Sequence, residues 1–186
     1  TDGLNRFDGS RVKIFRHKSG DSTTIAHNNC FSLLEGNDGD IWMATEKGVS
    51  RYTAATGSFR NYFFHHPYLN DNIINSIKGL AKDAEGNIWA SSYGLWCINP
   101  DTDSIYGNWY RPGDSASLSD PSSTHKLVFD DRNNGLWVNT DNALHFFDIA
   151  SGQFFYRFHN PLQWRVFNLP DKNPFLAAAN GIVWYY

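Results

Sequence analysis

The chain has 186 residues and a formal net charge of −3, enough length for one domain with a buried core. Its lysines and arginines form no basic stripe, so we do not expect this segment to bind nucleic acid. No apolar run approaches the roughly 18 residues that span a bilayer, so we expect no membrane contact by this segment. Aromatic residues make up 16% of the chain, and Gly, Asn, Asp and Ser recur at short intervals, which indicates an all-β domain.

Residues 1–26, taken first in chain order, look like the end of a repeating unit. They contain Gly3-Leu-Asn-Arg-Phe7, in which a small residue is followed by an aliphatic and then an aromatic residue. The tryptophan that precedes this pattern in later units would fall before Thr1. We therefore expect a partial unit here, and a chain that begins in the middle of a repeat.

Residues 27–71 form the first complete unit. Turn residues separate short runs of strand-forming residues, and Gly or Asn at the turns can adopt positive φ. The expected strands are residues 32–34, 41–44, 49–52 and 58–63, with turns at 37–39, 46–48 and 56–57. Residues 72–120 and 121–162 repeat this pattern, and residues 163–186 begin it again with Leu176 at the tryptophan position.

The repeat is clearest around three tryptophans, Trp42, Trp89 and Trp137, which stand 47 and 48 residues apart. The segments around them align without gaps from ten residues before each Trp to three after it. A small residue and a Thr or Ser recur behind each Trp, and the repeat-defining positions include Thr45, Gly48, Gly94 and Thr140. Because the tryptophans recur at one position of every unit, we interpret them as packing residues between units and not as a sugar-stacking ladder.

Four short antiparallel strands in 44 to 49 residues are typical of one blade of a β-propeller. The rungs of a β-helix are shorter, and an α-solenoid would show a 3.6-residue period that this chain lacks. The fold predicted is an all-β propeller segment of about three complete blades with a partial blade at each end. An incomplete ring leaves open edges, so we expect the remaining blades of a longer array, or a second copy of the chain, to complete it.

A further motif marks the junctions between blades. Gly20-Asp-Ser-Thr-Thr-Ile25-Ala-His-Asn28 is similar to Gly113-Asp-Ser-Ala-Ser-Leu118-Ser-Asp-Pro121, with a fainter copy from Pro67 to Asn72. The two cysteines, Cys30 and Cys97, occupy non-equivalent places, so we expect two buried thiols, with a disulfide as the alternative. No metal or cofactor is expected, because the chain lacks His-Glu-x-x-His, Gly-x-Ser-x-Gly and phosphate-loop motifs.

These motifs together resemble the two-component regulator propeller repeat. The resemblance rests on Asp38-Gly-Asp-Ile-Trp42-Met-Ala-Thr45, on Gly48-Val-Ser-Arg-Tyr52, on Thr56-Gly-Ser-Phe59 and on the junction motif, and it covers nearly the whole chain. The turn at Asn133-Asn134 and the missing Trp of the last unit depart from the pattern.

The resemblance implies a function. Such repeats form the periplasmic sensor region of hybrid two-component histidine kinases in Bacteroides-type bacteria, where they detect glycans or their breakdown products. It therefore implies a periplasmic segment of an inner-membrane-anchored protein that binds an oligosaccharide or another small ligand. The segment itself would be no enzyme.

We expect a ligand site among loop residues that break the repeat. The candidates are the His65-His66 pair, the run Trp109-Tyr110-Arg111, Tyr93 at a turn, and the pair Trp164-Arg165. An aromatic face beside a guanidinium suits a sugar that carries a carboxylate or a sulfate. The alternatives are a solvated loop for the histidines and packing between blades for the aromatic residues.

The sequence also fits two other functions. Some propellers are lyases or hydrolases that act on cyclic peptides or polysaccharides, and such an activity would need a convergent cluster of His and charged side chains. A purely structural or dimerisation role would need an exposed edge.

Overall fold

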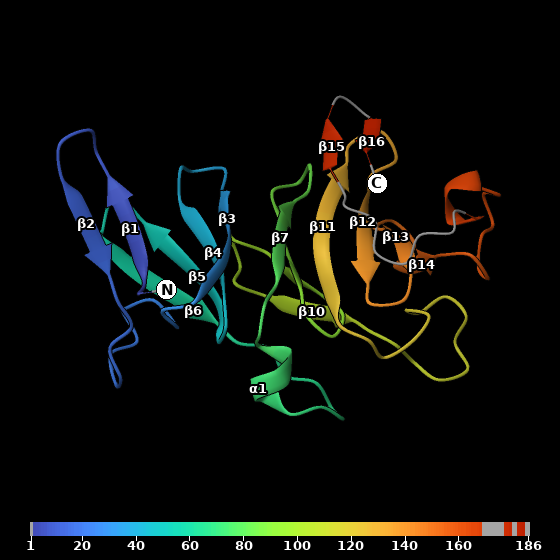
Figure 1. Cartoon of the computed structure of the whole chain (residues 1–186), viewed down its shortest axis with the longest axis horizontal. Coiled ribbons are helices and arrows are strands. Elements are labelled where there is room, and N and C mark those ends of the chain that lie inside the picture. Colours follow the sequence, from blue (N-terminus) through green and yellow to red (C-terminus); the bar gives the residue numbers. More distant parts are fainter. Residues whose placement is uncertain (1, 169–176, 180–181, 185–186) are drawn as a thin grey trace. The chain divides into compact units, whose positions relative to one another are not determined.

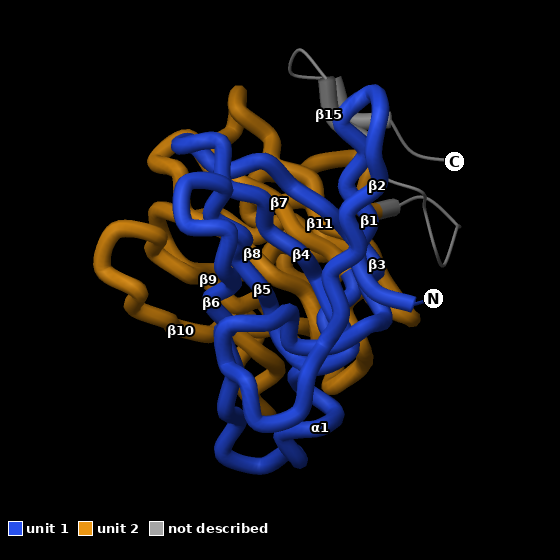
Figure 2. The backbone as a smooth tube through the Cα atoms, turned by 90° about the vertical axis from the view of Figure 1, so that its left-hand side faces the viewer, with its two compact units in different colours: residues 1–78 blue, residues 79–186 orange. Residues whose placement is uncertain are grey.

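The computed structural model describes residues 2–168, 177–179 and 182–184 (Figure 1). The chain divides into two compact units, residues 1–78 and 79–186, which Figure 2 shows in blue and orange. Of the predicted features, Leu176 lies outside the described residues. No helix among the described residues is long and apolar enough to cross a membrane.

The first unit holds a two-stranded sheet, a four-stranded sheet and a short helix. The four-stranded sheet is antiparallel with strand order β3-β4-β5-β6, so each strand pairs with its neighbour in sequence. The elements are β1 (Leu4–Phe7), β2 (Val12–Phe15), β3 (Cys30–Glu35), β4 (Ile41–Thr45), β5 (Gly48–Thr53), β6 (Ser58–Tyr62) and α1 (Asp71–Ile74).

The second unit holds two four-stranded sheets, with strand orders β10-β9-β8-β7 and β11-β12-β13-β14, followed by a two-stranded sheet. The elements of the first are β7 (Gly79–Lys82), β8 (Ile88–Ser91), β9 (Leu95–Ile98) and β10 (Ile105–Asn108). Those of the second are β11 (Thr124–Asp130), β12 (Gly135–Thr140), β13 (Leu144–Asp148) and β14 (Gln153–Phe155). They are followed by η1 (Arg165–Asn168), β15 (Ala177–Ala179) and β16 (Ile182–Trp184).

Each four-stranded sheet is a propeller blade, a meander of short antiparallel strands, so the predicted fold class is confirmed. The three blades lie within residues 27–71, 72–120 and 121–162. The helix α1 was not predicted from the sequence. It begins where the side chain of Asn70 accepts a hydrogen bond from the amide of Asn72 at 2.8 Å, a standard N-cap.

All three repeated tryptophans are buried. Within the second unit, Trp89 lies between the two blades, with its ring centroid 5.3 Å from that of Phe147 in the next sheet. Its indole Nε1 donates to Oδ2 of Asp83 at 2.8 Å. In the first blade, the threonine three residues after Trp42 has a local role. Oγ1 of Thr45 donates to the carbonyl of Gly48 at 2.8 Å across the β4–β5 turn.

The gap-free alignment of the three segments is wrong by one residue in the last blade. The β7–β8 turn joins Asp83 to Asn87, whereas the β11–β12 turn joins Asp130 to Gly135 and is one residue longer. The extra residue is accommodated by Asn134, which has a φ of 47°. As a result Asp130, and not Asp131, accepts the indole hydrogen of its tryptophan, at 2.9 Å.

Both cysteines are free thiols. Cys97 is fully buried, and burial raises the pKa of its thiol to about 12. Cys30 is partly buried, and burial also raises the pKa of its thiol.

Candidate functional site

The first junction motif folds into a tight loop, residues 18–26, which we call the first junction loop. The amide of Lys18 donates to Oγ1 of Thr24 at 3.1 Å, and the amide of Asp21 donates to the carbonyl of Lys18 at 3.1 Å. Oδ1 of Asp21 accepts from the amide of Thr23 at 3.1 Å. Ile25 anchors the loop because its side chain is fully buried. The Gly-Asp-Ser motif is therefore the sequence of a self-bonded turn.

The second junction motif folds in the same way at residues 111–119, the second junction loop. The amide of Arg111 donates to Oγ of Ser117 at 2.9 Å, and the amide of Ala116 donates to Oδ1 of Asp114 at 2.9 Å. Leu118 takes the place of Ile25 and is 2% exposed.

Each loop docks on the outer strand of the blade that follows it. The carbonyl of Thr23 accepts from the amide of Phe59 on β6 at 3.0 Å, and the carbonyl of Ala116 accepts from the amide of Phe154 on β14 at 2.7 Å. Both loops thus place a backbone acceptor on an edge strand.

Each loop also reaches the third strand of its blade. In the first copy the amide of Ala26 donates to Oγ of Ser50 at 3.0 Å. In the second copy the amide of Ser119 donates to Nε2 of His145 at 3.3 Å. The two copies therefore share a backbone scaffold and differ in the side chains that it holds.

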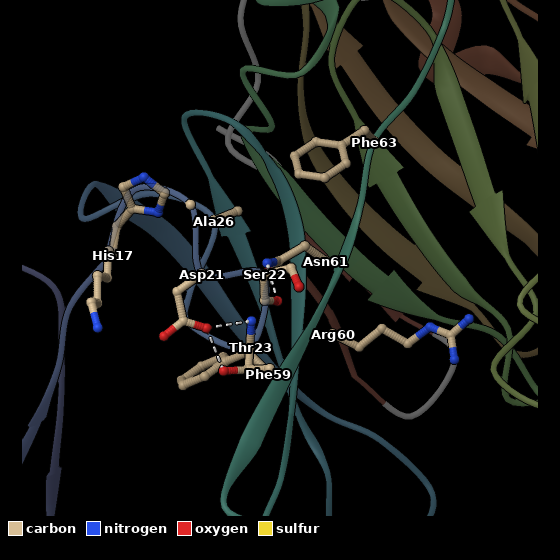
Figure 3. Close-up of a pocket in the computed structure, with 11 residues that line it drawn as sticks. His17, Asp21, Ser22, Thr23, Ala26, Phe59, Arg60, Asn61 and Phe63 are labelled. Atoms are coloured by element: carbon tan, nitrogen blue, oxygen red, sulfur yellow. Dashed lines mark hydrogen bonds between the residues drawn. The ribbon is translucent and has the colours of Figure 1, made fainter.

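In the first copy the scaffold leaves an open depression of about 610 Å³ between the loop and β6. We call it the β6 depression (Figure 3). Its walls include His17, Ala26, Asn61 and Phe63, and all of its lining residues belong to the first unit. A depression of this size can hold part of a small-molecule ligand.

Asn61 braces the β6 depression. Its Nδ2 donates to the carbonyl of Thr24 at 2.9 Å, and its Oδ1 accepts from Oγ of Ser50 at 2.7 Å. These bonds hold the loop on β6 and use both polar atoms of the Asn61 side chain. The short side chain does not fill the space above it.

Larger side chains occupy the corresponding positions of the second copy. Tyr110 stands in the place of His17, Tyr156 in the place of Asn61, and His145 in the place of Ser50. Tyr156 is buried with its ring centroid 5.3 Å from that of His145, and burial, more than the nearby Asp114 and Tyr110, raises the pKa of its phenol. Tyr110 packs against the core of the second unit. The β6 depression is thus the same scaffold with smaller side chains.

The charged residues of the two loops also differ. In the second loop Nη2 of Arg111 pairs with Oδ2 of Asp114 at 2.7 Å, and Nε of the same guanidinium lies 2.9 Å from that oxygen. Lys18 and Asp21 hold the same positions in the first loop. Among the residues that the structure describes no ion pair joins these two, although the charge of Lys18 contributes weakly to lowering the pKa of Asp21.

Asp21 uses one carboxylate oxygen for the loop. Thr23 contributes both donors to Oδ1, its amide at 3.1 Å and its hydroxyl at 2.6 Å, and these bonds lower the pKa of the carboxyl group. In Figure 3 the second oxygen points away from Thr23.

The upper wall of the β6 depression combines an imidazole with an exposed ring. Nδ1 of His17 lies 2.9 Å from the carbonyl of Ile25, so Nδ1 carries the hydrogen and Nε2 is an acceptor when the ring is neutral. Phe63 follows β6 directly, is 59% exposed and points toward the depression (Figure 3). Arg60 extends to the other side of β6, where its guanidinium lies 5.8 Å from the ring centroid of Tyr62.

The predicted run Trp109-Tyr110-Arg111 has packing and pairing partners. The ring centroid of Trp109 lies 5.6 Å from that of Trp96, Tyr110 packs on the core, and Arg111 pairs with Asp114. These three residues do not present the aromatic face beside a free guanidinium that the sequence suggested.

Trp164 and Arg165 also separate. Trp164 packs in an aromatic cluster, with its ring centroid 5.4 Å from that of Trp137, and Asn160 bonds its backbone at both ends. Arg165 is exposed in η1. Trp164 is thus a packing residue, the alternative to ligand binding that the sequence left open for it.

The histidine pair and Tyr93 lie elsewhere. Nδ1 of His65 lies 3.1 Å from Oδ1 of Asp71, and both side chains are exposed. His66 is 6% exposed, and burial, with a smaller effect of His65, lowers the pKa of its imidazole. Tyr93 is partly buried in the β8–β9 turn. Over the described residues, no three His, Cys, Asp or Glu side chains gather as a metal site.

Sequence reasoning missed His17, Lys18, Asn61 and Phe63. A signal for them was present: the two junction motifs align, and Tyr110-Arg111 in one copy stands against His17-Lys18 in the other. The outer strands align too, with Tyr156 against Asn61. At both positions a large aromatic residue of one copy is replaced by a smaller polar residue in the other. Because the two positions face each other, these replacements predict a depression.

No protein-family model matches the chain, and no curated protein sequence matches it. Among solved structures, the extracellular domain assigned to a hybrid two-component system of B. thetaiotaomicron superposes with a TM-score of 0.73 at 18% identity, over 99% of this chain. The chain spans 23% of that domain's length.

Virginiamycin B lyase from Staphylococcus aureus superposes with a TM-score of 0.64 at 16% identity, over 94% of this chain and 52% of the enzyme. At these identities the similarity shows the fold. The chain has the fold of a β-propeller segment, and its similarity to an extracellular sensor domain agrees with the resemblance carried by its repeat motifs.

Proposed function

We propose that this chain is part of the periplasmic, ligand-sensing propeller of a hybrid two-component sensor kinase that is anchored in the inner membrane. Its ligand is an oligosaccharide released during polysaccharide breakdown, and its role is binding, not catalysis. The proposal is supported by the repeat motifs and by a superposition on an extracellular sensor domain that covers 99% of the chain.

The β6 depression is the ligand site in this proposal. The observation that carries this assignment is the pair of junction loops, because one scaffold is filled by Tyr110 and Tyr156 and the other is open at His17 and Asn61. An exposed phenyl ring, Phe63, beside hydrogen-bonding groups is the composition that a sugar ring requires, since its C–H face packs on an aromatic ring and its hydroxyls need polar partners.

Calorimetry of the chain against a panel of oligosaccharides tests the proposal. We expect at least one sugar to bind, and Phe63→Ala to weaken its binding about tenfold, because stacking on an aromatic ring contributes on the order of 1 kcal/mol. Phe158→Ala is the matched control. Phe158 holds the equivalent position in the second copy, is 85% exposed, and belongs to the other unit.

Two results would count against the proposal. If no neutral or acidic oligosaccharide binds, the chain does not sense sugars by itself. If a sugar binds and Phe158→Ala weakens it as much as Phe63→Ala does, the ligand site is not the β6 depression.

A second candidate function, a lyase or hydrolase that acts on a cyclic peptide or polysaccharide, rests on one side-chain pair. Nε2 of His125 lies 2.6 Å from Oδ1 of Asp141, with the side chains 37% and 55% exposed. A carboxylate that orients an imidazole is a feature of general bases. Turnover of such a substrate, abolished by His125→Ala and unchanged by His65→Ala in the other exposed His–Asp pair, would favour it.

A further inference from the structure

The first junction loop places a positive and a negative group, Lys18 and Asp21, in the lining of the β6 depression without an ion pair between them. In the second junction loop the guanidinium of Arg111 occupies Oδ2 of Asp114 through two nitrogens. In the first loop Thr23 bonds to Oδ1 of Asp21, and Lys18 uses its backbone amide in the turn. Substituting Lys for Arg on the same backbone therefore leaves an ammonium and a carboxylate oxygen available to a ligand.

A ligand for this place must supply a donor to Asp21 and an acceptor to Lys18. A hydroxyl group is both donor and acceptor, so two adjacent hydroxyls of a sugar ring can satisfy both partners. A carboxylate or sulfate satisfies Lys18 but brings a second negative charge toward Asp21, which repels it. Asp21 is ionised at neutral pH, as a solvent-accessible aspartate is, and the bonds from Thr23 lower the pKa of its carboxyl group further.

The remaining surface is apolar or neutral. Phe63 presents its ring, Ala26 and Phe59 are buried in the floor, and the Nε2 of neutral His17 is an acceptor. These groups match the apolar face and the hydroxyl edge of a pyranose. Arg60 also lines the depression, but its guanidinium extends to the other side of β6 and lies 5.8 Å from the ring centroid of Tyr62.

We infer that, within the sensing role proposed above, the β6 depression selects neutral sugars, with Lys18 and Asp21 binding adjacent hydroxyls of a ring that stacks on Phe63. This proposal differs from the expectation from the sequence, in which Arg111 lies at a site suited to sugars that carry a carboxylate or a sulfate. Lys18 and Asp21 are then the residues that determine specificity.

The test compares a neutral oligosaccharide with one of the same linkage that carries a uronic acid, by calorimetry in about 50 and about 300 mM NaCl. We expect the neutral sugar to bind about tenfold more tightly, with a Kd that changes less than about twofold between the two salt concentrations, because no net ligand charge is screened. We expect Lys18→Gln and Asp21→Asn each to weaken its binding about tenfold.

Matched variants in the second loop serve as controls. Arg111→Gln and Asp114→Asn change the same positions of the scaffold but lie in the other unit, so they are expected to leave Kd within about twofold. Asn at position 21 retains an Oδ1 for the Thr23 amide. Lys18→Gln keeps the backbone amide that bonds to Thr24, so folding is preserved in at least one of the two variants.

The outcomes separate the two proposals. Tighter binding of the uronic acid sugar with a steep salt dependence overturns the preference for neutral sugars but leaves the sensing role intact. Binding of a free amino acid in place of any sugar overturns the preference as well, because a zwitterion would bridge the same two charges. Failure of every saccharide to bind overturns the proposed function itself.

Discussion

The backbone amide of Ser119 donates a hydrogen bond to Nε2 of His145 at 3.3 Å, and the Oγ of Ser119 lies 3.0 Å from the same nitrogen. His145 is fully buried on β13. Because its Nε2 accepts the amide hydrogen of Ser119, the unprotonated ring holds the second junction loop against the blade. In the first copy Ser50 does this with a hydroxyl that accepts from the amide of Ala26.

This relationship predicts a pH dependence of stability. Burial lowers the pKa of His145 from 6.5 to about 4, so the unfolded chain binds a proton in this range that the folded chain does not. The stability contribution is complete above pH 6.5 and is lost as the pH falls toward 4, with a slope of at most about 1.4 kcal/mol per pH unit. Urea denaturation at several pH values measures it.

His145→Ser, which copies Ser50, is the control for this pH dependence. It removes the titrating ring and leaves a hydroxyl acceptor, so the slope between pH 4 and 6.5 should decrease relative to the unmodified chain. His66, whose pKa burial also lowers, is present in both proteins and does not affect the difference. Equal slopes in the two proteins would show that His145 is not the titrating group.

The aspartates that bind the tryptophan indoles predict a second result. Asp83→Ala leaves the Nε1 of a tryptophan that is 1% exposed without an acceptor, and Asp130→Ala does the same for Trp137. We expect each variant to lose about 1–3 kcal/mol of unfolding free energy. Asp131→Ala, at an exposed neighbour, should cost less than about 0.5 kcal/mol, and a larger loss there would restore the gap-free alignment.

Gly107 predicts a coupling with Trp96. A Cβ at position 107 would lie 2.5 Å from the Trp96 ring and 2.9 Å from the Trp109 ring. Gly107→Ala should therefore destabilise the second unit by about 1–3 kcal/mol through overpacking. In a Trp96→Ser background, which copies Ser50, the added methyl should cost less, because the two closest overlaps are removed and only that with Trp109 remains. A double-mutant cycle by denaturation measures this difference, and additive costs would contradict the overlap.

The β6 depression predicts a filled variant. Ser50→His together with Asn61→Tyr installs the pair that packs in the second copy, whose rings are 5.3 Å apart. We expect the double variant to remain folded and to bind the sugar at least about tenfold more weakly, because the rings occupy the ligand's place. Thermal melting and calorimetry check the two parts. Unchanged affinity in a folded variant would place the ligand elsewhere.

Most of the fold could be predicted from the sequence because each signal was local. Turn residues such as Gly39 and Gly57, which have φ values of 74° and 69°, separate the strands, and the tryptophan repeat sets their order. The extra residue in the β11–β12 turn, near Asn134, was not predicted, because one insertion inside a polar turn does not change the pattern of hydrophobic residues.

The candidate site was harder to predict because it depends on which side chains face each other. Trp109 and Trp164 break the repeat and look like ligand-binding residues, yet their neighbours Trp96 and Trp137 are long-range packing partners. The site residues His17 and Asn61 are smaller than Tyr110 and Tyr156, which hold the same positions in the second copy. A small residue indicates an open space only when the residue that faces it across the space is also small.

The backbone bonds from Thr23 to Phe59 and from Ala116 to Phe154 bear on how such repeats stay soluble. An outer strand is an open template for another strand, and an array of blades presents one such edge per repeat. Here a carbonyl from the preceding junction blocks each of these two edges. Because the blocking atom belongs to the main chain, the side chains of the loop are free to diverge between repeats without exposing the array to aggregation.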